Sequence, residues 1–114
     1  MGIFKVAQKP NKKTDAELWT LITKMISVGN YVFLKHAHDR LKDRNISDID
    51  VLDILENKPR RKRKRNKRKD VLLSGYSDWN YCIEGNDLDS GKIRIIISFD
   101  DELMLVITVI RIDN

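Results

Sequence analysis

The sequence predicts an α+β domain of two layers, in which three N-terminal helices precede an antiparallel sheet of about three to four strands. Apolar residues recur at helical spacing through the first half of the chain. Past the middle, the period changes to the alternation that is typical of strands. A dense run of basic residues separates the two halves. Helices followed by strands in separate blocks favour the α+β class.

The first helix has a clear signal at each end. Thr14 and Glu17 have the spacing of a capping box, and apolar residues follow at helical intervals. Gly29 supplies a left-handed stop. A helix is therefore expected over about 15–28, followed by a short extended link at 31–33.

Two more helices are expected before the basic run. The second covers about 34–44 and has few apolar residues, which indicates a surface helix. Ser47 caps the third, with Asp50 at the acidic position of the box. Asn57 and the proline that follows shortly after end this helix.

The second half of the chain reads as strands and turns. Segments 71–76 and 79–84 are strand-like, and 92–99 places alternate apolar residues on one face. Residues 100–102 form a hairpin turn. Segment 103–112 is apolar at nearly every position, as expected for a central strand that is covered on both faces.

Length and composition favour one small intracellular domain. With 114 residues, the chain can bury a single core, and we expect a flexible basic arm at 1–13 before a single domain at 14–114. Its only cysteine, Cys82, excludes an internal disulfide framework and suits a reducing compartment. No apolar run approaches the roughly 20 residues of a membrane span. We therefore expect a cytoplasmic protein with no membrane association.

The basic segment at 59–69 determines the sign of the whole chain. The sequence has 22 basic and 17 acidic residues, a net charge of +5, and nine of the basic residues lie between Arg60 and Lys69. The rest of the chain has 13 basic and 17 acidic residues, which gives a net charge of −4. Such a block attracts polyanions, so nucleic acid or an acidic partner is expected, although solvated loops and nuclear-import addresses share the pattern. The predicted nucleic-acid-binding residues are Arg60, Arg61, Lys62, Arg63, Lys64, Arg65, Arg68, Tyr76 and Tyr81.

The sequence offers no pattern for metal or nucleophilic catalysis. His36 and His38 would point about 200° apart on a helix, so they would not share one ion. We expect no cofactor. If the strands pair in sequence order, basic, aromatic and amide side chains converge on one face of the sheet, where they would neutralise phosphates and stack on bases. This set comprises Lys67, Lys69, Tyr76, Trp79, Asn80, Tyr81, Arg94 and Arg111.

One stretch of the helical half carries a family resemblance. It runs His36-Ala37-x-x-Arg40-Leu41-x-x-Arg44-Asn45-Ile46-Ser47-x-x-Asp50-Val51. This pattern resembles the helical half of small bacterial domains of the RelE-like superfamily, which continue into a curled antiparallel sheet. The first helix and the C-terminal strands are also similar to the MqsR mRNA interferases of that superfamily.

The resemblance implies a toxin that cleaves mRNA without metal, usually on the ribosome, and that a cognate antitoxin protein neutralises. Matched by position, the active residues fall at Lys67 or Lys69, Asn80, Arg94 and Arg111. Where the MqsR interferases have Gln, Tyr and Lys, this chain has Asn80 and the two arginines. Attack by a ribose 2′-OH on the adjacent phosphate needs a proton acceptor and a proton donor, and arginine rarely exchanges its proton. These roles would fall to Lys67, Lys69, Tyr76, Tyr81 or His36.

Two classes of function follow from the sequence. The first is a toxin-type endoribonuclease that inhibits translation. The alternative is a non-catalytic module on the same fold, which binds nucleic acid or an acidic partner protein through residues 60–69. Cleavage of RNA by the purified protein separates the two.

Overall fold

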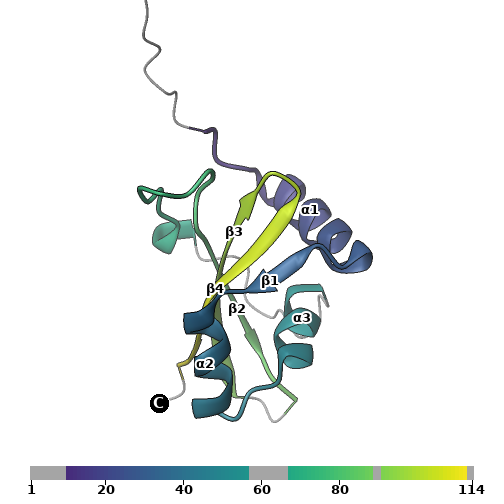
Figure 1. The fold of residues 1–114 in the computed structure, drawn as a ribbon, viewed down its shortest axis with the longest axis vertical. Helices are drawn as coiled ribbons and strands as arrows, with labels where there is room; N and C mark the ends of the chain where they lie inside the picture. Colours follow the sequence, from purple (N-terminus) through teal and green to yellow (C-terminus); the bar gives the residue numbers. More distant parts are fainter. Residues whose placement is uncertain (1–9, 57–66, 89–90, 113–114) are drawn as a thin grey trace, which may run out of the picture.

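The computed structural model describes residues 10–56, 67–88 and 91–112 (Figure 1). The fold is α+β, as predicted, with helices packed against a four-stranded sheet. The elements are α1 (Asp15–Val28), β1 (Tyr31–Phe33), α2 (Lys35–Asp43), α3 (Asp48–Glu56), the short 3₁₀ helix η1 (Lys67–Lys69), β2 (Tyr81–Asn86), β3 (Lys92–Asp100) and β4 (Leu103–Arg111).

The order of the elements differs from the prediction of three N-terminal helices followed by an antiparallel sheet. The segment expected as a link between the first two helices is strand β1, which pairs parallel with β4, Tyr31 opposite Met104. The sheet is therefore mixed, in the order β1-β4-β3-β2, with antiparallel pairs only among β2, β3 and β4. A segment of only three residues forms a strand here because it pairs with β4, which lies about seventy residues further along the chain.

Three helix ends follow their local signals, while the stop predicted at Asn57 lies outside the described residues. Thr14 and Glu17 form the complete capping box, with N–H to oxygen distances of 3.2 and 2.9 Å, and Gly29 has φ 76° at the end of α1. Helix α3 begins after Ser47, whose Oγ accepts from the Asp50 N–H at 3.0 Å. Helix α2 begins one residue later than predicted, because Leu34 donates its N–H to Val106 in β4 and stays extended.

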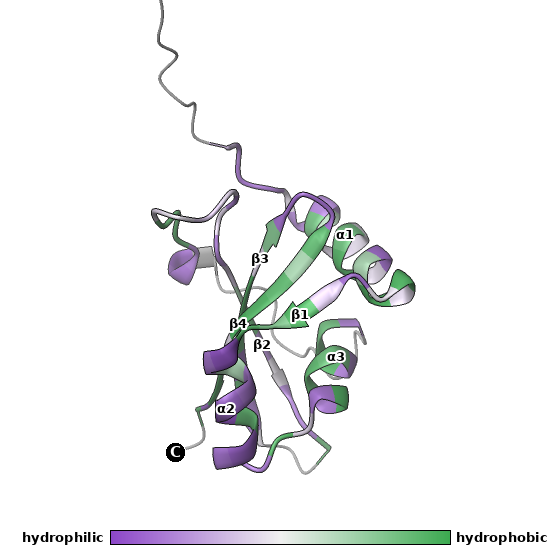
Figure 2. Cartoon of the chain, viewed as in Figure 1, coloured by the Kyte–Doolittle hydropathy of each residue, from purple (hydrophilic) through white to green (hydrophobic). Residues whose placement is uncertain are grey.

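A single core lies between the helices and one face of the sheet. The buried side chains of all three helices form one cluster with the inward-facing residues of β2, β3 and β4. On β3, Ile93, Ile95, Ile97 and Phe99 face this core, as the alternation predicts. Figure 2 shows the contrast between the apolar strands and the polar outer side of α2.

The other face of the sheet, here called the open face, is partly exposed over β4 and β1, whereas over β2 its residues Cys82 and Glu84 are buried. Burial along β4 alternates, with Met104, Val106 and Val109 fully buried and their neighbours partly exposed. The expectation that this strand is covered on both faces is therefore wrong, because the described helices cover one face only. The apolar residues on the open face are Val32, Ile96, Leu103, Leu105, Ile107 and Ile110.

The segment expected as a strand at 71–76 forms a loop instead. Only an isolated bridge joins Val71 to Asn80, and β2 begins at Tyr81 rather than at residue 79. Gly75 has φ 91°, which breaks an extended chain. The Asp70 carboxylate accepts from the Cys82 N–H at 2.9 Å, so a side chain takes the place of a strand partner.

Candidate functional site

A buried ion pair lies on the open face of the sheet. Glu84 of β2 stands directly opposite Arg94 of β3, and Arg94 Nε donates to Glu84 Oε2 at 2.9 Å. The Glu84 side chain is 3% exposed, whereas that of Arg94 is 26% exposed. The buried Glu84 carboxylate therefore binds the Nε edge of the Arg94 guanidinium. The Nη groups of Arg94 make no hydrogen bond with the part of the chain that the structure describes.

This geometry suits the binding of an anion. A guanidinium presents N–H donors in a rigid fork that matches the oxygens of phosphate or carboxylate. With Nε fixed by Glu84, the Nη donors of Arg94 have less orientational freedom to lose when a ligand binds. Lys92, two residues earlier on the same face, adds a second exposed cation.

Arg111 lies on the opposite face of the sheet. It stands opposite Ile93, which is fully buried in the core, and its Nη1 donates to Asp87 at 2.9 Å. The cause is a bulge: the register between β3 and β4 shifts by one residue at Ile107, which reverses the alternation of every later residue. The prediction that Arg94 and Arg111 converge on one face is therefore wrong.

A polar hollow of about 550 Å³ lies beside Arg111 on the helix side. Its lining combines two arginines with two carboxylates, so it has no strong preference for one sign of charge. The lining residues are Arg44, Asn45, Asp50, Asp87, Leu88, Gly91 and Arg111.

The predicted aromatic and amide residues are mostly buried. Asn80 is 3% exposed, pairs through its backbone with Val71, and its Oδ1 has no hydrogen-bond partner within the described ranges. Tyr81 is fully buried and donates its hydroxyl to Asp78 at 3.1 Å, so its ring is unavailable to a base. Tyr76 is half-buried and Trp79 packs against the core.

The basic segment is described only at its end. Lys67 lies in η1, which packs beside β2, and Arg68 and Lys69 of the same turn are exposed. Arg60, Arg61, Lys62, Arg63, Lys64 and Arg65 lie outside the described residues. Of the predicted catalytic residues, Arg94 is a partly exposed cation on the open face and Lys69 is exposed in η1, whereas Asn80 is buried and Arg111 lies on the other face of the sheet.

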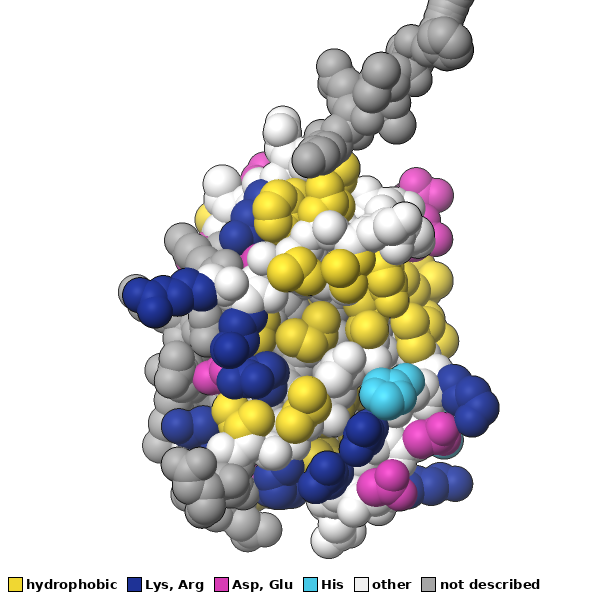
Figure 3. All heavy atoms as spheres, turned by 90° about the vertical axis from the view of Figure 1, so that its left-hand side faces the viewer, with side chains coloured by type: hydrophobic (Ala, Val, Ile, Leu, Met, Phe, Trp, Pro, Cys, Tyr) yellow, Lys and Arg dark blue, Asp and Glu magenta, His cyan; other side chains and the backbone are white. Residues whose placement is uncertain are grey.

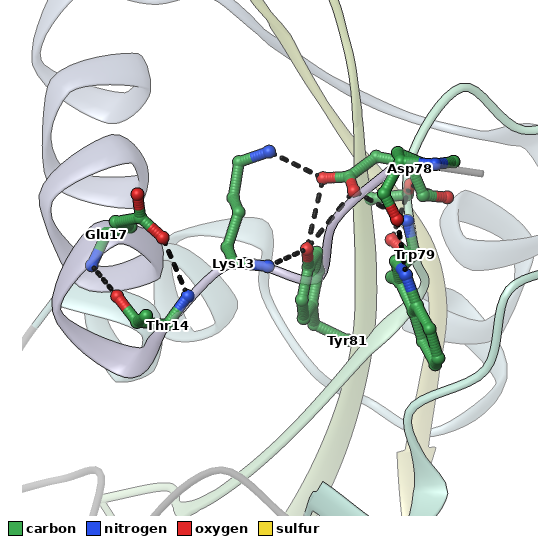
Figure 4. Close-up of polar contacts among 8 residues, drawn as sticks. Lys13, Thr14, Glu17, Asp78, Trp79 and Tyr81 are labelled. Atoms are coloured by element: carbon green, nitrogen blue, oxygen red, sulfur yellow. Dashed lines mark hydrogen bonds and ion pairs between the residues drawn. The ribbon is translucent and has the colours of Figure 1, made fainter. Parts of the chain in front are cut away.

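A second polar cluster anchors the residues before α1 (Figure 4). Lys13 donates through its Nζ to Asp78 at 2.7 Å and through its backbone N–H to the Tyr81 hydroxyl at 3.0 Å. Lys12 pairs with the buried Asp70 at 2.9 Å, and its ammonium lies 5.2 Å from the Trp79 ring centroid. Within the arm predicted at 1–13, these described residues are fixed on the body of the domain, and 1–9 lie outside the described residues.

Sequence reasoning missed Glu84, Asp70 and Asp78. Each is a carboxylate buried in or beside a strand, at 2%, 7% and 5% exposure. A buried carboxylate needs a partner. Glu84 follows directly on the apolar residues Tyr81-Cys82-Ile83, and this position was the signal in the sequence for a buried, paired carboxylate.

Two further properties concern the described residues alone. They contain no group of three or more His, Cys, Asp or Glu side chains placed to hold a metal ion. None of their helices has both the length and the apolar character needed to cross a membrane.

These features define a small α+β domain with one helical layer, one open sheet face and a cross-strand ion pair on that face. The chain belongs to the family described as a domain of unknown function (DUF4258), which matches residues 33–111. The match begins at the end of β1 and takes in α2, α3 and the three antiparallel strands. No curated protein and no solved structure matches the chain.

Proposed function

We propose that this domain is a toxin-type endoribonuclease that inhibits translation by cleaving mRNA without a metal ion. The observation that carries the proposal is the Glu84–Arg94 pair, which sets a partly exposed guanidinium on the open face of a strongly basic domain. A RelE-like fold, a ribosome-bound substrate and a cognate antitoxin protein belong to the same proposal, which the motif from His36 to Val51 supports by resemblance.

Arg94 would serve as the clamp for the reacting phosphate. The ribose 2′-oxygen bonds to phosphorus, the bond from phosphorus to the 5′-oxygen breaks, and the leaving oxygen takes a proton from water. Negative charge grows on the phosphoryl oxygens during this step, and the Nη donors of Arg94 would stabilise it. Glu84 is a positioning residue, because it is buried and acts through the guanidinium that it holds.

The 2′-hydroxyl proton requires an acceptor with an accessible side chain. Tyr81 is excluded because it is fully buried. Among the acceptors that the sequence suggests, His36 and Lys69 are exposed and Tyr76 is half-buried.

The test is cleavage of a labelled RNA by the purified protein in the presence of a metal chelator, with and without ribosomes. Arg94→Ala should lower the rate by about 10²–10³-fold, the usual effect of removing one donor to a developing oxyanion. Lys24→Ala is the matched control, since this exposed cation lies on α1 and its removal should leave the rate unchanged. Intact RNA with folded wild-type protein, or equal rates for Arg94→Ala and wild type, would refute the proposal.

The separation of Arg94 from Arg111 favours a second candidate, a non-catalytic module that binds nucleic acid or an acidic partner through the basic segment. A catalytic set that does not share one face lacks the convergence that chemistry requires. This candidate expects RNA binding without cleavage, with an affinity that falls steeply as salt rises. Replacement of residues 60–69 by Ser and Gly would then abolish binding, while Arg94→Ala would weaken it only slightly.

A further inference from the structure

The segment of residues 10–13 lies on the body of the domain as a bound peptide lies on its receptor (Figure 4). It belongs to no helix or strand. Its polar contacts instead join it to side chains of the segment 70–81, which is distant in the sequence. Side chains of the body, rather than a helix or a ladder, therefore hold this part of the chain in place.

Two contacts bind the backbone of this segment. Trp79 Nε1 donates to the Pro10 carbonyl oxygen at 3.1 Å. The Tyr81 hydroxyl oxygen accepts from the Lys13 backbone N–H at 3.0 Å. The body thus provides one donor and one acceptor for the peptide backbone, and these set the direction in which the segment lies.

Two carboxylates bind the lysine side chains. The Lys12 ammonium pairs with Asp70 at 2.9 Å, and the Lys13 ammonium pairs with Asp78 at 2.7 Å. Each ammonium also lies near an aromatic ring, at 5.2 and 5.3 Å from the ring centroid, where cation–π attraction acts. Lysines at two consecutive positions are therefore bound both by charge and by an aromatic surface.

The groups that receive the segment are held in place by the body itself. Asp78 accepts from the Trp79 backbone N–H at 2.8 Å and from the Tyr81 hydroxyl at 3.1 Å. Asp70 accepts from the Cys82 N–H at 2.9 Å. The two aspartate side chains are 0% and 7% exposed, whereas the two lysine side chains are 29% and 27% exposed. The receiving groups are therefore preorganised, and their occupant lies at the surface.

The charges that surround these contacts have both signs. Asp100 adjoins them, because its carboxylate accepts from the Ser77 Oγ at 3.1 Å, and Glu102 in the following turn pairs with a lysine of α1 at 3.4 Å. The basic turn η1 immediately precedes Asp70, and its Lys69 is exposed. The overall charge of this region therefore does not select an occupant, whereas the direct contacts of the two lysines identify one.

This part of the surface is open to another polypeptide. The loop that carries both carboxylates lies on the side of the molecule that Figure 3 faces, where hydrophobic side chains stand next to Lys and Arg (Figure 1). Within this loop, Val71 is 42% exposed and Leu73 is 47% exposed. A peptide longer than four residues therefore has apolar side chains to contact beside the two carboxylates.

We infer that Asp70, Asp78, Trp79 and Tyr81 form a binding site for dilysine peptides, here called the dilysine site. Residues 10–13 are its resident occupant, and they detach while the rest of the domain stays folded. A segment of a partner polypeptide then takes their place, provided that it presents two consecutive lysines and a backbone carbonyl two positions before the first. This inference stands on the contacts of residues 10–13 and does not rest on RNA cleavage.

Hydrogen exchange in the wild-type full chain tests the detachment. When residues 10–13 leave, the Trp79 indole N–H loses the Pro10 carbonyl and exchanges with solvent, whereas β3 stays paired with strands on both sides. The protection factor of this indole should be lower than those of the β3 amides by about 100-fold or more, as in local opening. Added salt should lower it further, because both ion pairs include a partly exposed lysine.

Binding of a separate peptide is tested on a double variant of the full chain, Lys12→Glu with Lys13→Glu, whose own segment the two aspartates repel. A synthetic peptide with the sequence Pro-Asn-Lys-Lys should shift the Trp79 indole signal saturably. The isomer Lys-Asn-Lys-Pro has the same net charge but does not place both lysines at the carboxylates. It should bind about tenfold more weakly or not at all, the usual effect of losing one hydrogen bond between charged groups.

Wild type should bind the peptide about tenfold more weakly than the double variant, because its own segment competes at an effective concentration in the millimolar range. Lys35→Glu with Lys42→Glu is the matched control: it makes the same change of charge on α2, leaves residues 10–13 docked, and should bind like wild type. Lys12→Ala with Lys13→Ala frees the site without added repulsion and should bind like the glutamate variant. Circular dichroism and thermal melting confirm that each variant is folded.

Three results would overturn the inference. They are equal protection of the Trp79 indole and the β3 amides, the lack of a saturable shift in both open variants, and equal affinity for the peptide and its isomer. The first result would mean that residues 10–13 leave the body only when the whole domain unfolds. RNA cleavage is measured separately, so failure of either proposal is distinguishable from failure of the other.

Discussion

Replacement of Tyr81 by phenylalanine should destabilise the domain strongly while preserving its shape. The ring is fully buried, and phenylalanine retains its apolar volume. The change deletes a hydroxyl that donates to Asp78 at 3.1 Å and accepts from the Lys13 N–H at 3.0 Å (Figure 4). Asp78 keeps its ion pair with the Lys13 ammonium at 2.7 Å, so only the hydroxyl contacts are lost.

The cost follows from those two contacts. A hydrogen bond to a charged group contributes about 1.5–3 kcal/mol, and an unsatisfied N–H adds part of its own desolvation. We expect the free energy of unfolding to fall by about 2–3 kcal/mol. For a domain of this size, about 1 kcal/mol shifts the melting temperature by roughly 4–8 °C, so the melting temperature should fall by roughly 10–20 °C.

Urea unfolding followed by tryptophan fluorescence measures this loss, because Trp79 lies beside the network. Tyr76→Phe is the matched control: this tyrosine is half-buried, its hydroxyl makes no hydrogen bond with the described residues, and surface changes usually stay within about 0.5 kcal/mol. A loss below about 0.5 kcal/mol for Tyr81→Phe, or equal losses for both variants, would refute the assignment of stability to this hydroxyl.

Three further predictions concern the ends of α1. The hydrogen bond that Glu17 accepts from the Thr14 backbone N–H, and its bond with the Thr14 side chain, lower the pKa of Glu17 below its usual 4.5. The stabilisation is therefore complete above about pH 4.5 and is lost as the pH falls through the lowered pKa of the folded state. Thr14→Ala, which keeps the backbone N–H, should cost about 0.5–2 kcal/mol through loss of the cap. Glu17→Ala removes the titrating group, so it should lower stability at neutral pH and change it little below pH 4, as acid-range unfolding curves would show; an equal loss at both pH values would contradict this. Gly29 has φ 76° and free space around its Cα, so Gly29→Ala should cost about 1 kcal/mol through backbone strain alone, and unchanged stability in the same assay would contradict that assignment.

The sequence predicted the features that depend on neighbouring residues. The capping box at Thr14, the stop at Gly29 and the cap at Ser47 each involve groups within a few positions of one another, and the structure confirms all three. The apolar face of β3 also follows from local alternation. Features that depend on distant partners were missed, since the pairing of β1 with β4 joins segments separated by most of the chain.

The loop before β2 shows how local preference can mislead. Segment 71–76 has the apolar composition of a strand, but buried carboxylates on either side of it compete for the backbone. Asp70 takes the Cys82 N–H, and Asp78 takes the Trp79 N–H at 2.8 Å. A backbone N–H that donates to a nearby carboxylate is not available to pair with another strand. The apolar composition of a segment does not reveal this competition.

The bulge in β4 explains both the separation of the arginines and the composition of the open face. Without the extra residue at Ile107, strict alternation would turn Thr108 toward the helices and Val109 away from them. The observed register buries Val109 completely and leaves Thr108 partly exposed, which keeps a hydroxyl out of the apolar core. The same shift turns Arg111 toward the helix side, where Asp87 accepts its guanidinium. Arg94 lies on β3, whose own alternation is unbroken, and it stays on the open face. The core therefore buries Val109 rather than Thr108, and this choice at one position of β4 separates Arg94 from Arg111, which the sequence alone places together.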